Sequence, residues 1–366
     1  MRDLFEYMNY HKTWNSPDLT PAENAIETVF KSNNIRTTHI NTIYGTSVAR
    51  FEYRLDDLKA YDKVAKIESQ FKALFDNENA VLTKDGAVVA IEIPVNGGTL
   101  YLGDMFKSKS FIDSSRFTVA IGRSTRGKDV YADMEDLKHI LIAGTTGSGK
   151  SIFMHNLILS IIAKHTNNAD VYIIDPKMSE FSDYSASPCC HVVTTAADAV
   201  SLLSNLCTIM DERYRIFANA GCRDIVAYND KNEPMKRIFL FTDELGDLMK
   251  SSHRKTAENY IVRLAQKARA CGIHLVLATQ YPKSDIVTGT IKQNMPTKIC
   301  FATTSNTGSI VMLDRKGAER LVGKGDMLYQ TEKDIKPSRL QAAYANDNDR
   351  AVVILYSRGY DFERRD

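Results

Sequence analysis

The chain has 366 residues, more than one ordinary core accommodates, and this length predicts two or three domains. Lys and Arg total 47 against 45 for Asp and Glu, so the net charge of +2 excludes a protein that coats nucleic acid through bulk charge. No apolar run is long enough to span a membrane and the six cysteines lack a zinc-binding spacing, so we expect a cytoplasmic protein without membrane insertion.

The first part of the chain carries no catalytic signature. Residues 1–22 mix aromatic and polar side chains with two prolines, a pattern typical of an N-terminal arm. Residues 23–115 predict a small α+β domain. Its expected helices lie at 23–33 and 56–77, and its expected strands at 46–55, 80–83 and 87–94.

Residues 116–366 have a different pattern, because short apolar strands alternate there with helices. After a hairpin at 117–133, strands are predicted at 138–143, 171–174, 191–193, 237–242, 274–278 and 298–302. Helices at 150–164, 196–220 and 255–271 separate them. Continuous hydrophobicity along the strands indicates that both faces of the sheet are covered. We therefore predict an α/β domain with a doubly wound, mainly parallel sheet.

A glycine-rich segment joins the strand at 138–143 to the helix at 150–164. It reads Gly144-Thr145-Thr146-Gly147-Ser148-Gly149-Lys150-Ser151 and matches GxxxxGK[ST] in the strand–loop–helix context that this pattern requires. Its glycines let backbone N–H groups surround a phosphate, while Lys150 supplies a charge for the β- and γ-phosphates and the Ser151 hydroxyl ligates Mg²⁺. The segment predicts binding of ATP with Mg²⁺.

Two later strands end in polar residues at the sheet edge where ligands bind in α/β folds. Asp243 and Glu244 follow the strand at 237–242, and we expect Asp243 to orient Mg²⁺ and Glu244 to act as the general base. Gln280 follows the strand at 274–278, and we expect its amide to sense the γ-phosphate. These residues predict an ATPase.

Several segments, in this order, resemble the successive signatures of the FtsK/SpoIIIE DNA translocases in the FtsK–HerA superfamily. They are 139–151, Ile174-Asp175-Pro176-Lys177, 243–249, 264–274 and 323–329, and segments 45–52 and 89–94 are similar to the small α domain of that family. The resemblance implies a RecA-like P-loop NTPase core preceded by the small α+β domain. The family's membrane anchor and winged-helix domain have no counterpart here, so the chain resembles a minimal motor of a plasmid, phage or other mobile element, or a truncated form.

The same resemblance implies a hexameric ring around double-stranded DNA, with ATP bound between subunits. An arginine of one subunit then reaches the γ-phosphate held by the next, and the family motif places it at Arg269. Arg263 and Arg315 are the alternative candidates for this arginine.

On the DNA side the resemblance is weaker. Lys292 matches a basic, DNA-facing position of the family, and Lys283 lies nearby. Tyr281 stands where the family commonly has an arginine, and segment 303–310, similar to a pore loop that is usually basic, carries no charge. We expect Lys292 and Lys283 to carry most of the phosphate contacts.

Three functions stay open at this point. The first is a DNA-stimulated ATPase that translocates double-stranded DNA largely independently of sequence. The second is a conjugation- or secretion-type ATPase that delivers a protein or nucleoprotein, since such ATPases share this motor fold. The third is an ATP-gated module that assembles on DNA without moving, an option that the uncharged segment 303–310 keeps open.

Overall fold

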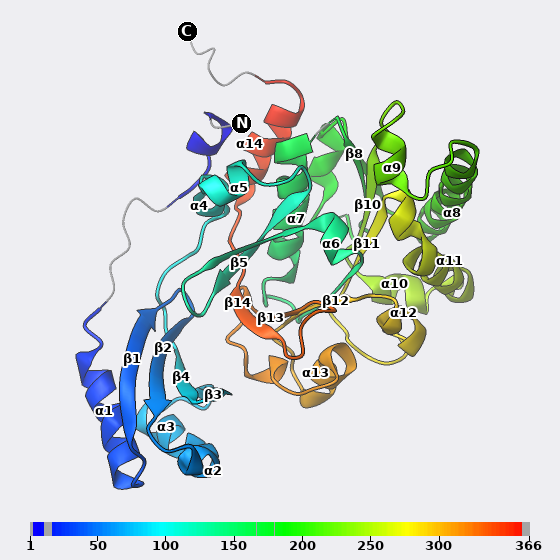
Figure 1. Ribbon diagram of the computed structural model, residues 1–366. Coiled ribbons are helices and arrows are strands. Elements are labelled where there is room, and N and C mark those ends of the chain that lie inside the picture. The colour runs from blue at the N-terminus through cyan, green and yellow to red at the C-terminus, as the bar shows by residue number, and fades with distance from the viewer. Residues whose placement is uncertain (1–2, 11–16, 166, 179, 361–366) are drawn as a thin grey trace. The chain divides into compact units, whose positions relative to one another are not determined.

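The computed structural model describes residues 3–10, 17–165, 167–178 and 180–360 (Figure 1). The chain forms two compact units. Unit 1 comprises Met1–Tyr10, Tyr101–Gly122 and Val130–Asp366, and unit 2 comprises His11–Leu100 and Arg123–Asp129. The domain boundaries at residues 22 and 115 stay predictions.

Unit 2 contains a four-stranded antiparallel sheet in the order β1-β2-β4-β3. Its elements are α1 (Thr20–Ser32), β1 (Thr37–Tyr44), β2 (Val48–Leu55), α2 (Tyr61–Lys66), α3 (Glu68–Leu74), β3 (Val81–Asp85) and β4 (Val88–Pro94). The rings of Phe30, Tyr53 and Phe71 form its core, with Phe30 centroids 5.3 Å from Tyr53 and 5.4 Å from Phe71. This aromatic core joins the helices to one face of the sheet.

The sequence prediction for unit 2 needs two corrections. It omits strand β1, because this edge strand has exposed or half-buried residues that show no alternation. The helix predicted over 56–77 is instead a 3₁₀ turn at Leu58–Ala60 followed by α2 and α3, which are separated at Ile67. The backbone at Ile67 has φ −100° and ψ 6°, outside the helical region. The apolar residues that predicted one helix over 56–77 therefore belong to two short helices.

Unit 1 is built on a ten-stranded sheet in the order β6-β5-β14-β13-β12-β7-β11-β10-β8-β9. Its strands are β5 (Thr118–Ser124), β6 (Asp129–Asp133), β7 (Ile140–Ala143), β8 (Ala169–Ile174), β9 (Cys190–Val193), β10 (Arg237–Thr242), β11 (Ile273–Thr279), β12 (Thr297–Phe301), β13 (Asp326–Gln330) and β14 (Ser338–Gln341). From β12 to β9 all neighbours are parallel, whereas β12, β13 and β14 pair antiparallel. The predicted α/β class with a mainly parallel sheet is confirmed.

Helices cover both faces of the parallel strands (Figure 1). Helices α7 (Lys150–His165) and α14 (Asp347–Ser357) lie on one face, and α8 (Ala196–Asn219), α10 (Leu245–Lys250) and α11 (Arg254–Lys267) lie on the other. In β7, Leu141 and Ala143 join the core formed with α8, α10 and α11. Shorter helices are α4 (Leu102–Phe106), α5 (Lys109–Ile112), α6 (Met134–Leu137), α9 (Ile225–Asn229), α12 (Gly289–Gln293) and α13 (Asn306–Leu313). No helix in the described ranges is long and apolar enough to cross a membrane.

The first described residues belong to unit 1. A 3₁₀ turn at Asp3–Glu6 buries Leu4 and Phe5, and the Phe5 ring lies 5.2 Å from that of Phe106. The backbone N–H of Asn9 donates to Asp349 Oδ1 at 2.8 Å, at the start of α14. Within residues 3–10, the described part of the segment predicted as an arm, Leu4, Phe5 and Met8 are therefore buried in this unit, whereas Tyr7 and Tyr10 are exposed.

Candidate active site

The phosphate loop occupies the turn between β7 and α7 in a conformation that requires glycine. Gly147 and Gly149 have φ values of 76° and 106°, in the region that L-residues rarely adopt. A Cβ on Gly149 would lie 2.5 Å from the backbone nitrogen of Gly325, which itself donates to the Ser148 carbonyl at 2.8 Å. The loop Gly323–Asp326 thus packs directly against the phosphate loop.

The geometry of this loop fits an anion. Helix α7 has 16 residues and no acidic residue in its first turn, so its leading N–H groups and its dipole present positive potential. A Cβ on Gly147 would meet nothing within 4 Å, which leaves the backbone of the loop approachable there. Backbone N–H groups and Lys150 are the hydrogen-bond donors that nucleotide phosphates require. The oxygen of the Ser151 hydroxyl is a suitable ligand for Mg²⁺.

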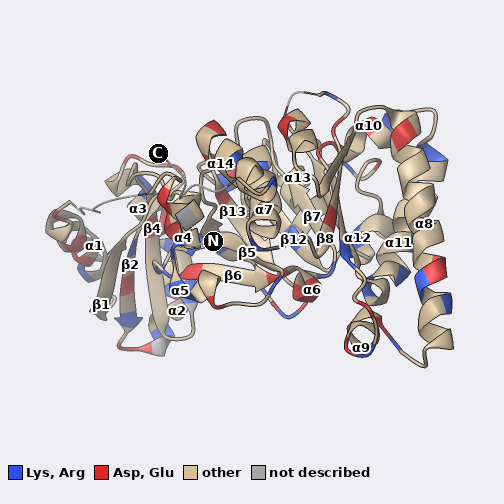
Figure 2. Cartoon of the chain, turned by 90° about the horizontal axis from the view of Figure 1, so that it is seen from above, with Lys and Arg blue, Asp and Glu red and all other residues tan. Residues whose placement is uncertain are grey.

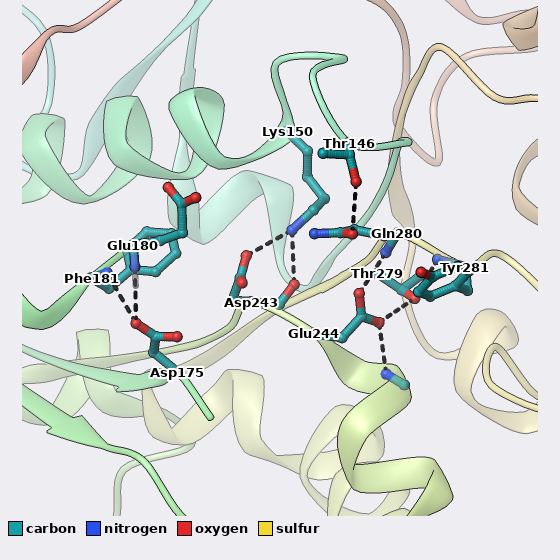
Figure 3. Close-up of polar contacts among 11 residues, drawn as sticks. Thr146, Lys150, Asp175, Glu180, Phe181, Asp243, Glu244, Thr279, Gln280 and Tyr281 are labelled. Carbon is teal, nitrogen blue, oxygen red and sulfur yellow. Dashed lines mark hydrogen bonds and ion pairs between the residues drawn. The ribbon is translucent and has the colours of Figure 1, made fainter. Parts of the chain in front are cut away.

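Lys150 and Asp243 form a buried ion pair (Figure 3). The Lys150 Nζ lies 2.7 Å from Asp243 Oδ1 and 2.9 Å from the Asp243 main-chain oxygen, and both side chains are almost fully buried. Strand β11 separates β7 from β10, so the sheet order brings the two residues to the same carboxyl edge. The structure thereby joins the predicted phosphate-binding lysine to the predicted magnesium-orienting carboxylate.

Glu244 is held by three hydrogen-bond donors (Figure 3). Its Oε1 accepts from the Gly246 backbone N–H at 2.9 Å and from the Thr279 hydroxyl at 2.7 Å, and its Oε2 accepts from the Gln280 backbone N–H at 2.9 Å. Glu244 is also the N-cap residue of α10. The Thr146 hydroxyl donates to Gln280 Oε1 at 3.1 Å, so the phosphate loop, Gln280 and Glu244 form one connected network.

Two residues that sequence reasoning left without a role lie at the same edge. Thr279 is fully buried at the end of β11 and contacts Glu244, although its position directly before Gln280 was the only signal for it. Asp175 directly follows β8, and its Oδ2 accepts from the backbone N–H groups of Glu180 and Phe181 at 3.3 and 3.0 Å. Among the described residues its Oδ1 is buried without a hydrogen-bond partner.

Arg269 lies at the opposite edge of the sheet from Lys150. It is exposed in the 3₁₀ turn at Ala268–Cys271, which ends the helix predicted over 255–271. Burial, together with nearby positive charges that include Arg269, lowers the pKa of His139 to about 3 and that of His274 to about 4. These histidines stand at the amino ends of β7 and β11, whereas the phosphate loop follows the carboxyl end of β7.

The alternative arginines have partners of their own. An ion pair of 2.7 Å joins Arg263 Nη2 to Asp211 Oδ2. Arg315 Nη2 donates to the Ile335 carbonyl at 3.1 Å. Arg269 is exposed, and its assignment as the arginine that reaches a second subunit stays a prediction.

The predicted DNA-contacting lysines differ in their surroundings. Lys283 is exposed, whereas Lys292 Nζ lies 2.7 Å from Asp314 Oδ1 and its side chain is 16% exposed. Segment 303–310 is only partly a loop, because Ser305 caps α13 and residues from Asn306 onward are helical. Figure 2 shows basic and acidic residues interspersed over unit 1. The distribution of charge therefore does not single out one helix or strand as a DNA-binding element.

Fold and site together define a P-loop NTPase: a mainly parallel sheet, a phosphate loop on its central strand, and a carboxylate pair on a nearby strand. The model of the FtsK/SpoIIIE family matches residues 101–242 and 230–284. The chain belongs to the FtsK/SpoIIIE family.

Curated relatives support this assignment. The chain is 36% identical over 350 residues to the DNA translocase FtsK of Caldanaerobacter subterraneus subsp. tengcongensis, which covers 90% of this chain and 48% of the relative. It is 34% identical over 347 residues to the DNA translocase SftA of Bacillus subtilis, which covers 91% of this chain and 36% of the relative. The chain therefore spans about half or less of these relatives' length.

Solved structures show a similar fold. The conjugation coupling protein TcpA of pCW3, in its monomer form with ATPgS, is 23% identical with a TM-score of 0.65, and the alignment covers 92% of this chain and 99% of TcpA. The cytoplasmic domain of the type VII secretion ATPase EccC of Thermomonospora curvata is 21% identical with a TM-score of 0.59, covering 68% of this chain and 32% of that one.

Proposed function

We propose that this chain is an ATPase that drives double-stranded DNA through a ring-shaped oligomer, largely independently of sequence, in the service of a mobile element. The observation that carries the proposal is the network joining the phosphate loop, Asp243, Glu244 and Gln280 at one sheet edge. The relatives named DNA translocase FtsK and DNA translocase SftA support DNA as the substrate.

Nucleotide binding begins with an exchange of partners at Lys150. In the structure its ammonium is neutralised by Asp243, and the phosphates of ATP offer it a stronger anionic partner. When Lys150 turns to the phosphates, the Asp243 carboxylate is released, and Asp243 and the Ser151 hydroxyl are the residues that would hold Mg²⁺. A bound Mg²⁺ would supply positive charge that neutralises the phosphates.

Hydrolysis needs a base next to the γ-phosphate, and Glu244 fits this role. It adjoins Asp243 at the end of β10 and is almost fully buried, so water is scarce around it and a hydrogen bond to an attacking water gains strength. Gln280 is tied both to Glu244 through its backbone and to Thr146 through its amide oxygen. This position is suited to a side chain that registers whether the γ-phosphate is present.

Arg269 acts on the nucleotide of another subunit in this proposal. His139 to Gly144 spans five residue steps of extended chain, about 16 Å, so the amino and carboxyl edges of β7 are far apart. Arg269, near His139, is too far from the phosphate loop of its own chain for a side-chain contact. A ring that places this edge against the next subunit's nucleotide explains its exposure.

The decisive experiment measures hydrolysis with and without linear duplex DNA, and release of a third strand from a triplex on the same DNA. We expect duplex to stimulate hydrolysis and the third strand to be released only with ATP, with Lys150→Ala as the inactive control. Absence of stimulation refutes the DNA-translocase proposal. Stimulation without release indicates instead the ATP-gated binding module.

A second candidate function follows from one comparison. The alignment covers 99% of the solved chain of TcpA, a conjugation coupling protein, and this likeness in fold favours as the second candidate an ATPase that delivers a protein or nucleoprotein to a channel. Such an ATPase responds to its protein substrate rather than to bare duplex. Equal hydrolysis rates with and without duplex, and stimulation by a protein-bound DNA strand, distinguish it.

A further inference from the structure

Glu244 has both carboxylate oxygens engaged in the structure. Thr279 Oγ1 and the Gly246 N–H bind Oε1, and the Gln280 N–H binds Oε2 (Figure 3). Hydrogen bonds to an ionised carboxylate are roughly twice as strong as neutral ones. A base must use a lone pair to take a proton from water, and these three donors leave only one of the roughly four lone-pair sites of the carboxylate for that water.

Thr279 is the side chain through which this arrangement can change. The other two donors are backbone N–H groups, one of them in the helix that Glu244 itself caps. The Thr279 hydroxyl donates to Glu244 and accepts from the Tyr281 N–H at 3.0 Å. Any shift of Tyr281 relative to β11 therefore disturbs the atom that holds Glu244.

The side chain of Tyr281 extends this connection to the surface. Tyr281 is 51% exposed, and the Lys250 ammonium lies 5.0 Å from the centroid of its ring. Lys250 is the last residue of α10, the helix that begins after Glu244. An exposed aromatic–cation pair is a suitable contact for a nucleic-acid phosphate, because the ammonium attracts the anion and the ring shields one side. Glu244 is thus linked to this pair both through Thr279 and through α10.

We propose that Thr279 is a positioning residue that restrains Glu244 in a resting arrangement, and that DNA contact at Tyr281 and Lys250 releases it. This inference rests on the proposed function for the identity of the ligand. The restraint of Glu244 by Thr279 does not depend on DNA as the ligand, because it is tested by ATP hydrolysis alone. When Tyr281 is displaced, Thr279 loses the N–H that orients its hydroxyl, and Glu244 then keeps only the two backbone donors, Gly246 and Gln280, so Oε1 has one donor fewer to compete with the attacking water.

The test replaces the hydroxyl by a methyl group of similar shape, in Thr279→Val. We expect its hydrolysis without DNA to rise about tenfold, the equivalent of one charge-assisted hydrogen bond, and its stimulation by DNA to fall by the same factor. Thr279→Ser retains the hydroxyl and should behave as the wild type. Thr242→Val is the matched control, because Thr242 ends the neighbouring strand, is buried, and has a hydroxyl without a hydrogen-bond partner among the described residues.

A DNA-free rate of Thr279→Val at or below that of the wild type overturns the restraint, provided the melting temperature shows that the variant folds. An equal rise in Thr242→Val also overturns it, since packing alone then accounts for the effect. If the wild type is not stimulated by duplex, the proposed function fails while a faster Thr279→Val still supports the restraint. Tyr281→Ala separately tests the sensing step, and undiminished stimulation by DNA in that variant refutes it.

Discussion

Acid should destabilise unit 1 through histidines that are buried in the neutral form. His139 is 2% exposed, and its Nδ1 accepts from the Leu275 N–H at 3.1 Å, which leaves the proton on Nε2. That nitrogen has no hydrogen-bond partner within the described part of the chain. Burial, reinforced by the nearby His274 and Arg269, lowers the pKa of His139 to about 3.

The size of the effect follows from proton linkage. The unfolded chain binds a proton at this residue near pH 6.5 and the folded chain only near pH 3, so stability falls as the pH drops through this window. Between pH 7 and pH 5 a single such histidine costs about 2 kcal/mol. His274, with a pKa lowered to about 4, and His155, lowered to about 3, act in the same direction.

His139→Asn should reduce this pH dependence, because the Asn Oδ1 can accept the Leu275 N–H but does not titrate. The variant is expected to be less stable at pH 7 owing to its smaller side chain, yet to lose about 2 kcal/mol less than the wild type on going to pH 5. Urea unfolding followed by circular dichroism at both pH values measures this difference. The exposed His253→Asn is the matched control. Identical pH dependence in His139→Asn and the wild type refutes the argument.

Three further predictions concern the motor. Lys150→Ala should lose nucleotide binding, whereas Glu244→Gln should bind ATP and hydrolyse it at least about 100-fold more slowly; a wild-type rate in Glu244→Gln contradicts the general-base role. Arg269→Ala should bind ATP but be inactive, and mixing it with Lys150→Ala should restore part of the activity; no recovery despite demonstrated subunit exchange argues against a shared site. Lys292→Ala should weaken duplex binding equally for unrelated sequences and lower the salt slope by about one for each phosphate that the variant no longer neutralises, as a titration across salt concentrations measures. An unchanged slope removes Lys292 from the DNA path.

The parallel strands were predictable because burial on both faces leaves a continuous apolar run. The sequence Arg237–Thr242, for example, is buried at every position, and its prediction as a strand is confirmed. The antiparallel strands β13 and β14 were missed, since polar residues interrupt the apolar run in both, as in the sequences DMLYQ and SRLQ. Short helices such as α10 were missed because six residues are too few to show a helical period of apolar positions.

The site was predictable where chemistry depends on local spacing and unpredictable where it depends on contacts between strands. The phosphate loop is contiguous in sequence, so its residues could be named from their order. The bond from Thr279 to Glu244 joins residues 35 positions apart, and only the parallel pairing of β10 with β11 brings them together. Likewise, nothing in the sequence around Lys292 indicates that Asp314 partly neutralises it.

The hydrogen bond between Asn9 and Asp349 has a consequence for the order in which the protein forms. It joins residues 340 positions apart, and the Phe5 ring packs beside Phe106 in the same unit. During synthesis residues 3–10 leave the ribosome long before α14 exists, so Asn9 lacks its Asp349 partner until the end of unit 1 has been made. Closing so long a loop late is entropically costly and slow. The packing of Phe5 on Phe106 can therefore form early, whereas the bond that joins Asn9 to α14 is among the last contacts of unit 1 to form.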